Sequence, residues 1–69
     1  MDLKNIRKRA NLTQMQLADE CGCERSMIGK IENGVTVPSV RLAKKIAKVL
    51  NFDWTLFYAD EEETVNRGA

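Results

Sequence analysis

The fold is decided by residues 13–34, which read TQMQLADECGCERSMIGKIENG. Thr13 followed by Gln16 has the form of a capping box, in which two side chains satisfy free backbone amides at the start of a helix. The helix that begins there continues as an apolar stripe at helical spacing, formed by Leu17, Ala18 and Cys21. Gly22 is expected to end this helix, because glycine readily adopts the left-handed conformation of a C-terminal cap.

A second short helix is predicted directly after this turn, from about Glu24 to Asn33. Ile28 and Ile31 lie three residues apart and form its inward-facing pair. The Asn33-Gly34 dipeptide then provides a left-handed stop. Residues 13–34 therefore predict two short helices joined by a tight turn.

Helical spacing extends on both sides of this pair. A first amphipathic helix is predicted over residues 2–10, and its apolar face is formed by Leu3, Ile6 and Ala10. Residues 35–38 are expected to form a loop, after which Ser39 can cap a further helix. The apolar positions of that helix repeat at core spacing and are Leu42, Ala43, Ile46, Ala47 and Leu50.

A short fifth helix is expected from Asp53. Trp54 and Phe57 are three residues apart, so both rings are expected to point the same way and close the core. The sequence shows no strand alternation and no repeat, and we predict an all-α fold, a compact bundle of about five helices. A chain of 69 residues is too short for two domains, so we assign residues 1–58 to one domain and residues 59–69 to an acidic, flexible tail.

Charge is distributed unevenly along the chain. Residues 1–50 contain ten Lys or Arg and five acidic residues, whereas residues 51–69 contain one basic and five acidic residues. An excess of basic residues over acidic ones is typical of domains that bind nucleic acids, although an excess of five charges could equally serve solubility. Charge alone therefore leaves both explanations open.

The residue types needed for catalysis are scarce. The chain has no His, and it lacks a catalytic triad set, a phosphate-cradling glycine loop and a metal cluster, so we expect neither an enzyme nor a cofactor. Two cysteines cannot supply a structural zinc set within one chain. We interpret Cys21 and Cys23 as core thiols, with a redox sensor as the alternative.

The first residues give an expectation about location. No segment is long enough to cross a membrane, and the start of the chain lacks the apolar stretch and cleavage site of a signal peptide. We therefore expect a cytoplasmic protein.

The functional signal comes from the face that the second helix of the pair exposes. At about 100° per residue this face lies opposite Ile28 and Ile31 and contains Arg25, Ser26, Gly29 and Lys30. Arg and Lys can donate to guanine O6 and N7 in the major groove of DNA, and Ser can bond to several base edges. Gly29 either lets the helix approach the bases closely or is simply tolerated inside the helix.

One charge falls on an apolar face. Arg7 lies between Leu3 and Ala10, and Glu32 lies toward the Ile28 edge of the second helix of the pair. We predict an ion pair between Arg7 and Glu32 that ties this helix to the first helix of the chain. The alternative is that Arg7 extends its charged end into water.

These residues together resemble the helix-turn-helix regulators of the Cro and phage-repressor type, the XRE family. The resemblance spans roughly residues 3–57. It is carried by Leu12-Thr13-Gln14, Leu17-Ala18, Gly22, Ile28, Ile31-Glu32-Asn33-Gly34 and Pro38-Ser39. It implies a lambda-repressor-like DNA-binding domain, encoded by a bacterium or a phage, with the helix-turn-helix at its second and third helices.

The resemblance also implies roles for individual residues. Gln14, Asn33 and the backbone amide of Ser39 would contact phosphates, the last with help from the positive end of the helix that follows. The residues that would face base edges are Arg25, Ser26 and Lys30. The predicted pair of Arg7 and Glu32 resembles one in these repressors.

The sequence departs from the family pattern at Cys23-Glu24. The family usually has an aliphatic residue here, followed by a Ser or Thr cap. Glu24 instead places a negative charge close to the DNA. It would either interact favourably with the helix dipole or accept a hydrogen bond from cytosine N4.

We therefore expect a sequence-specific regulator of transcription that binds double-stranded DNA, and more narrowly a repressor that acts as a homodimer on a two-fold symmetric operator. Trp54, Phe57 and Tyr58 supply more apolar surface than one small core needs and form the expected dimer interface. The alternative function is that of an antitoxin or adaptor whose main partner is a protein docked on these aromatic residues.

Overall fold

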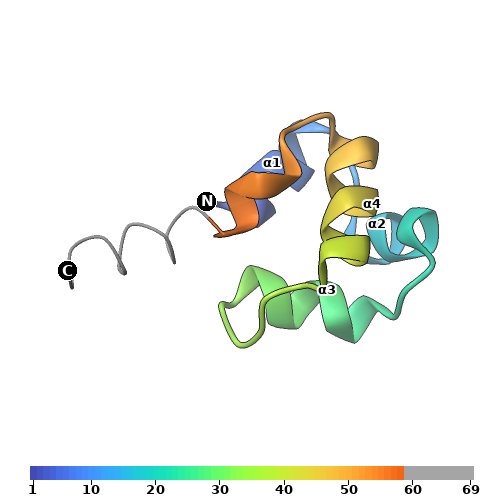
Figure 1. Cartoon of the computed structure of the whole chain (residues 1–69). Coiled ribbons are helices and arrows are strands. Elements are labelled where there is room, and N and C mark those ends of the chain that lie inside the picture. Colours follow the sequence, from blue (N-terminus) through green and yellow to red (C-terminus); the bar gives the residue numbers. More distant parts are fainter. Residues whose placement is uncertain (59–69) are drawn as a thin grey trace, which may run out of the picture.

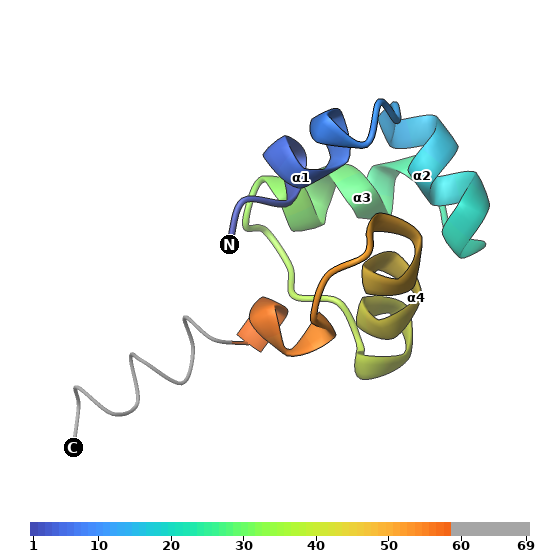
Figure 2. The same ribbon diagram turned by 90° about the horizontal axis from the view of Figure 1, so that it is seen from above.

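A computed structural model describes residues 1–58, so the tail expected over residues 59–69 lies outside the described residues. The described part contains no strand and consists of four α-helices and one short 3-10 helix (Figures 1 and 2). They are α1 (Leu3–Arg9), α2 (Gln14–Cys21), α3 (Arg25–Glu32), α4 (Val40–Leu50) and the 3-10 helix η1 (Trp54–Tyr58). The all-α fold is thus confirmed. No helix of the described residues is long and apolar enough to cross a membrane.

The predicted fifth helix is a 3-10 helix and not an α-helix. It has only five residues, too few for a useful ladder of α-helical hydrogen bonds. At its start the Asp53 carboxylate accepts hydrogen bonds from the Thr55 amide at 3.0 Å and the Thr55 hydroxyl at 2.8 Å. Such local side-chain bonds compete with regular helix.

The boundaries of the two central helices follow the predicted signals. The Thr13 hydroxyl accepts a hydrogen bond from the Gln16 amide at 3.1 Å, and the Gln16 side chain accepts one from the Thr13 amide at 2.8 Å, which completes the capping box. Gly22 ends α2 with a φ of 69°, and Gly34 follows α3 with a φ of 74°. The start of α2, the turn between α2 and α3 and the end of α3 therefore use the residues that the sequence predicts.

The helices pack around one small core. α3 lies against α2 and α1, α4 covers α2, and η1 packs on α4 (Figures 1 and 2). The largest side chains that are fully buried are Leu17 of α2, Ile28 of α3 and Ile46 of α4. Because each of these helices contributes one of them, the core fixes the angle between α2 and α3 and holds α4 behind both.

The aromatic residues of the last segment do not pack as expected. Phe57 packs against the core and against Phe52, with 5.5 Å between ring centroids. Trp54 instead packs edge to face on Tyr58 at 6.0 Å and lies 5.2 Å from the ammonium nitrogen of Lys44. Trp54 is half-buried but is not among the residues that pack against the core, so the prediction that both Trp54 and Phe57 close the core is wrong for Trp54.

Two glycines give a matched test of the turn. Gly22→Ala is expected to lower the free energy of unfolding by about 1 to 2 kcal/mol, because a side chain disfavours the left-handed backbone of this residue. Gly29→Ala lies inside α3 and is expected to raise it by about 1 kcal/mol. Urea unfolding followed by circular dichroism measures both, and equal stability of the two variants would contradict the proposed role of Gly22.

Candidate nucleic-acid interface

The face of α3 that was predicted to read bases is presented to solvent. Arg25, Ser26 and Lys30 are exposed, and Gly29 between them is half-buried. The opposite face is inside the molecule, where Ile28 is 0% and Ile31 9% exposed. The packing of the two isoleucines therefore turns three polar side chains outward together.

Internal packing does not require glycine at position 29. A Cβ atom placed on Gly29 would have the Gln14 Nε2 atom as its nearest neighbour at 3.9 Å, an ordinary van der Waals contact. The role of Gly29 in allowing close approach to DNA stays a prediction. Packing within the fold does not by itself explain why this residue is glycine.

Gln14, the first residue of α2, links the reading face to the inside of the fold. Its Nε2 atom donates to Glu32 Oε1 at 3.0 Å, and its Oε1 atom accepts from Arg25 Nη1 at 3.3 Å. Both ends of the amide thus have a partner of the matching type, which sets the orientation of the amide group. Sequence reasoning assigned Gln14 a phosphate contact and missed both hydrogen bonds, because they join residues that only the packing of α2 on α3 brings together.

The other two predicted phosphate contacts lie at the ends of the loop between α3 and α4. Asn33 and Ser39 are both exposed, and Asn33 is the C-terminal cap of α3. Ser39 caps α4 by accepting a hydrogen bond from the Leu42 amide at 3.2 Å. No hydrogen bond within residues 1–58 uses the backbone amide of Ser39, so this amide can donate to another group.

Arg7 and Glu32 form an ion pair inside the fold. Arg7 Nε donates to Glu32 Oε2 at 2.6 Å and Arg7 Nη2 to Glu32 Oε1 at 3.3 Å, with side chains that are only 8% and 2% exposed. Arg7 Nη1 also donates to the carbonyl oxygen of Leu12 at 2.7 Å. One guanidinium therefore holds α1, the connection to α2 and the end of α3.

The pKa of Glu32 is lowered by its surroundings. Burial of the carboxylate acts to raise this pKa, but hydrogen bonds from Arg7 and Gln14 and the positive charge of Arg7 outweigh burial. Because the folded state lowers the pKa, the stabilisation is present above the ordinary pKa of Glu, about 4.3, and is lost as the pH falls through the folded-state value. The pair therefore holds at neutral pH.

The residues predicted to form the dimer interface are only partly exposed. Phe57 contacts the core, and the Tyr58 hydroxyl donates to the carbonyl oxygen of Pro38 at 2.8 Å, so η1 is tied to the loop before α4. Leu56, which was not among the predicted residues, is 41% exposed on the same segment. Val40, at the start of α4, is 48% exposed.

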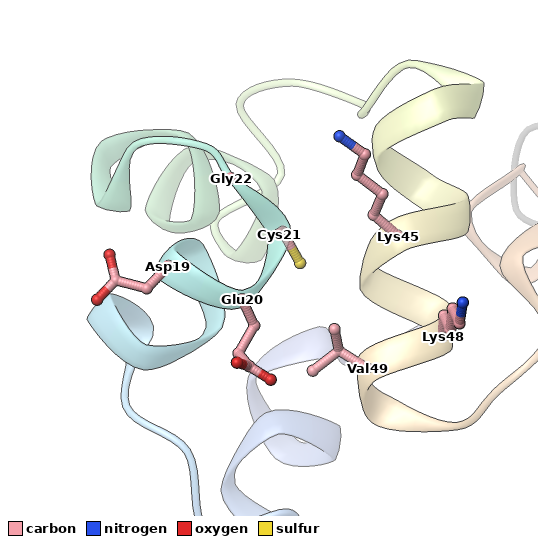
Figure 3. A pocket seen from close by; sticks show the side chains of 7 residues that line it. All are labelled: Asp19, Glu20, Cys21, Gly22, Lys45, Lys48 and Val49. Atoms are coloured by element: carbon pink, nitrogen blue, oxygen red, sulfur yellow. The ribbon is translucent and has the colours of Figure 1, made fainter.

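The two cysteines lie where α2 ends. Cys21 is 3% exposed and Cys23 is half-buried, and both thiols are free. Figure 3 shows the Cys21 sulfur directed toward α4, in a hollow that Lys45 and Val49 line from the other side. Burial raises the pKa of Cys21 to about 11, helped by the neighbouring Cys23 and Glu20. Among the described residues no group of three or more His, Cys, Asp or Glu side chains is placed to hold a metal ion.

Removal of one partner of the Arg7 and Glu32 pair is expected to lower the free energy of unfolding by on the order of 3 kcal/mol, because it leaves the other charge buried and unpaired. Arg7→Ala and Glu32→Gln test this by urea unfolding, with Arg9→Ala on the exposed side of α1 as the control. The stability of the native protein should also fall more steeply below pH 5 than that of Glu32→Gln. A loss of less than about 1 kcal/mol in both variants would show that the pair is not important for stability.

The thiol of Cys21 is expected to react slowly with iodoacetamide in the native protein. With a pKa of about 11, only about one thiol in a thousand is ionised at pH 8, and the thiolate is the reactive form. Mass spectrometry of timed samples should show Cys23 modified before Cys21, and urea should bring both to the rate of a free thiol. Fast modification of Cys21 without denaturant would instead support a redox role.

The chain matches known proteins over nearly all of the described residues. The sequence model of the helix-turn-helix family covers residues 3–57. The uncharacterized HTH-type transcriptional regulator YqaF of Bacillus subtilis is 41% identical over 58 residues, which is 84% of this chain and 76% of that protein. An uncharacterized HTH-type transcriptional regulator of Archaeoglobus fulgidus is 42% identical over 62 residues, covering 88% of this chain and 87% of its own.

A phage protein is also similar. The ImmF control region 10 kDa protein of Bacillus phage phi105 is 32% identical over 66 residues, 96% of this chain and 73% of that protein. No solved structure matches this chain. The family match and the arrangement of α2 and α3 agree with each other, and the chain belongs to the XRE-type helix-turn-helix family of DNA-binding transcription regulators.

Proposed function

We propose that this protein is a repressor that binds double-stranded DNA as a homodimer, with α3 of each copy in the major groove of one half-site. Two half-sites would then lie about 34 to 36 Å apart on one face of the duplex. The observation that carries this proposal is the face of α3, where Arg25, Ser26 and Lys30 are exposed opposite the fully buried Ile28. The protein bound to this site would exclude RNA polymerase from the promoter.

The base-reading role of Arg25 is supported by its contact with α2. The Gln14 amide accepts one hydrogen bond from the guanidinium, which has five N–H donors, so the remaining donors are available for guanine O6 and N7. A side chain that is already oriented loses less conformational freedom on binding. Gln14 thus prepares Arg25 for the bound geometry in the free protein.

The phosphate contacts would be made around this reading face. Gln14 uses one amide N–H for Glu32, and the second N–H of the same group is left for a phosphate oxygen. Asn33 and the Ser39 amide would donate hydrogen bonds to a phosphate at the other end of α3. These contacts place α3 in register and carry no base preference of their own.

Dimerisation is proposed at the C-terminal end of the described chain. The half-buried Trp54, Phe57 and Tyr58 are joined there by Leu56, which is 41% exposed. The bond from Tyr58 to Pro38 ties this surface to the loop that leads from α3 to α4. A second copy bound at η1 would therefore be linked mechanically to the phosphate-contacting loop.

A second candidate function is that of an antitoxin or adaptor whose main partner is another protein. The exposed apolar side chains of Leu56 and Val40 favour it, since a partner of different sequence could cover them as well as a second copy. Copurification of an unrelated chain in fixed proportion would support this alternative.

The first experiment is selection of binding sites from a random duplex pool with the purified protein, at near-physiological salt so that non-specific binding is suppressed. We expect enrichment of a two-fold symmetric sequence. If a single asymmetric half-site is enriched, the protein reads DNA without being a symmetric dimer. If nothing is enriched, the partner-protein function gains support.

Arg25→Ala and Lys30→Ala are expected to keep the fold, because both side chains are exposed, and to lose base preference. Each should lower discrimination at its own base pair by about 1 to 3 kcal/mol. Lys48→Ala removes the same charge from the exposed face of α4 and serves as the control, with unchanged preference. Dissociation constants for the selected site and for single-base variants, measured by fluorescence anisotropy, would test this. Full discrimination by both variants would contradict the proposed reading face.

A further inference from the structure

Glu24 is the residue before α3, and its side chain does not cap the helix, unlike the side chains that precede the other α-helices. Asp2, Thr13 and Ser39 each accept a hydrogen bond from the amide three residues on, at 3.1 to 3.2 Å. Glu24 makes no such bond, although its backbone has the extended conformation of a cap. Of the four α-helices described, α3 alone begins without a side-chain cap.

The Glu24 carboxylate is free of partners on the described part of the protein. It is exposed, and within residues 1–58 it takes part in no ion pair and no side-chain hydrogen bond. The adjacent Arg25 forms no ion pair with it, and the Arg25 guanidinium donates to Gln14 on α2. A negative charge is therefore held, unpaired, at the end of α3 that carries Arg25 and Ser26.

Near DNA such a charge is repelled by phosphates, and a hydrogen bond that it accepts from a base would offset this cost. The bases that offer a donor in the major groove are cytosine, with its N4 amino group, and adenine, with N6. An ionised carboxylate can only accept, and adenine places the acceptor N7 beside its donor, whereas cytosine does not. Guanine and thymine present acceptors. The chemistry of this carboxylate therefore favours cytosine.

We propose that Glu24 reads one cytosine in each half-site by accepting a hydrogen bond from cytosine N4. This inference rests on the proposed function, in which α3 enters the major groove. Glu24 is then a specificity-determining residue adjacent to the base pair read by Arg25, and its lack of a capping bond in the free protein leaves the carboxylate available for the base.

Binding-site selection with the native protein, Glu24→Gln and Glu24→Ala tests this proposal. The native protein should prefer cytosine at one position of each half-site by about tenfold over the other bases. Glu24→Gln should move that position toward adenine, because an amide can both accept from N6 and donate to N7. Glu24→Ala should lose the preference there and keep it at every other position.

Urea unfolding of the three proteins separates this role from a purely structural one. Equal unfolding midpoints with a changed base at one position support the proposal. A lower midpoint with weaker binding to all sequences alike would show that Glu24 acts on the helix, and would overturn it. A selected site that both variants leave unchanged overturns this inference alone, whereas a native protein that enriches no site overturns the proposed function as well.

Discussion

The buried pair of Arg7 and Glu32 is the contact on which the rest of the structure depends. Its guanidinium and carboxylate join α1, the Leu12 carbonyl and the end of α3, and Gln14 adds the start of α2 to the same carboxylate. Apolar contacts alone are non-directional and would allow these short helices to slide past one another. A charge pair with both partners under 10% exposed is satisfied in one arrangement only, so it defines the register of the helices.

The same network extends to the surface that is proposed to contact DNA. From Arg7 it runs through Glu32 and Gln14 to Arg25, so one series of polar contacts connects the inside of the bundle to the exposed end of α3. The fully buried Ile28 anchors the other side of this helix. A helix of only eight residues has little stability of its own, and these two anchors explain how it can present side chains in fixed positions.

At the C-terminal end of the described chain, the small core does not bury all of the aromatic residues. Phe57 packs against the core, while the half-buried Trp54 packs on Tyr58 and Lys44 instead. The cation over the indole ring and the bond from Tyr58 to Pro38 keep this segment folded on the body. The aromatic residues therefore serve the fold of one copy first, and the proposed dimer would use what they leave exposed, together with Leu56.

The sequence by itself determined the local structure. Its signals act between residues that are close in the chain: the capping box at Thr13, the glycines at positions 22 and 34 and the spacing of Ile28 and Ile31. The helix boundaries and the exposed face of α3 could therefore be predicted from the order of the residues. The hydrogen bonds of Asp53 with Thr55 at the start of η1 are local too, whereas the contact of Trp54 with Lys44 required the packing of η1 on α4.

Only the tertiary structure decided which polar side chains meet. Gln14 and Glu32 are 18 residues apart, and Gln14 and Arg25 are 11 apart. No helical period relates such positions, because the angle between α2 and α3 is set by the packing of Leu17, Ile28 and Ile46 in the core. The free carboxylate of Glu24 also could not be predicted from residue spacing, because whether a side chain caps its own helix depends on the atomic geometry at the helix start.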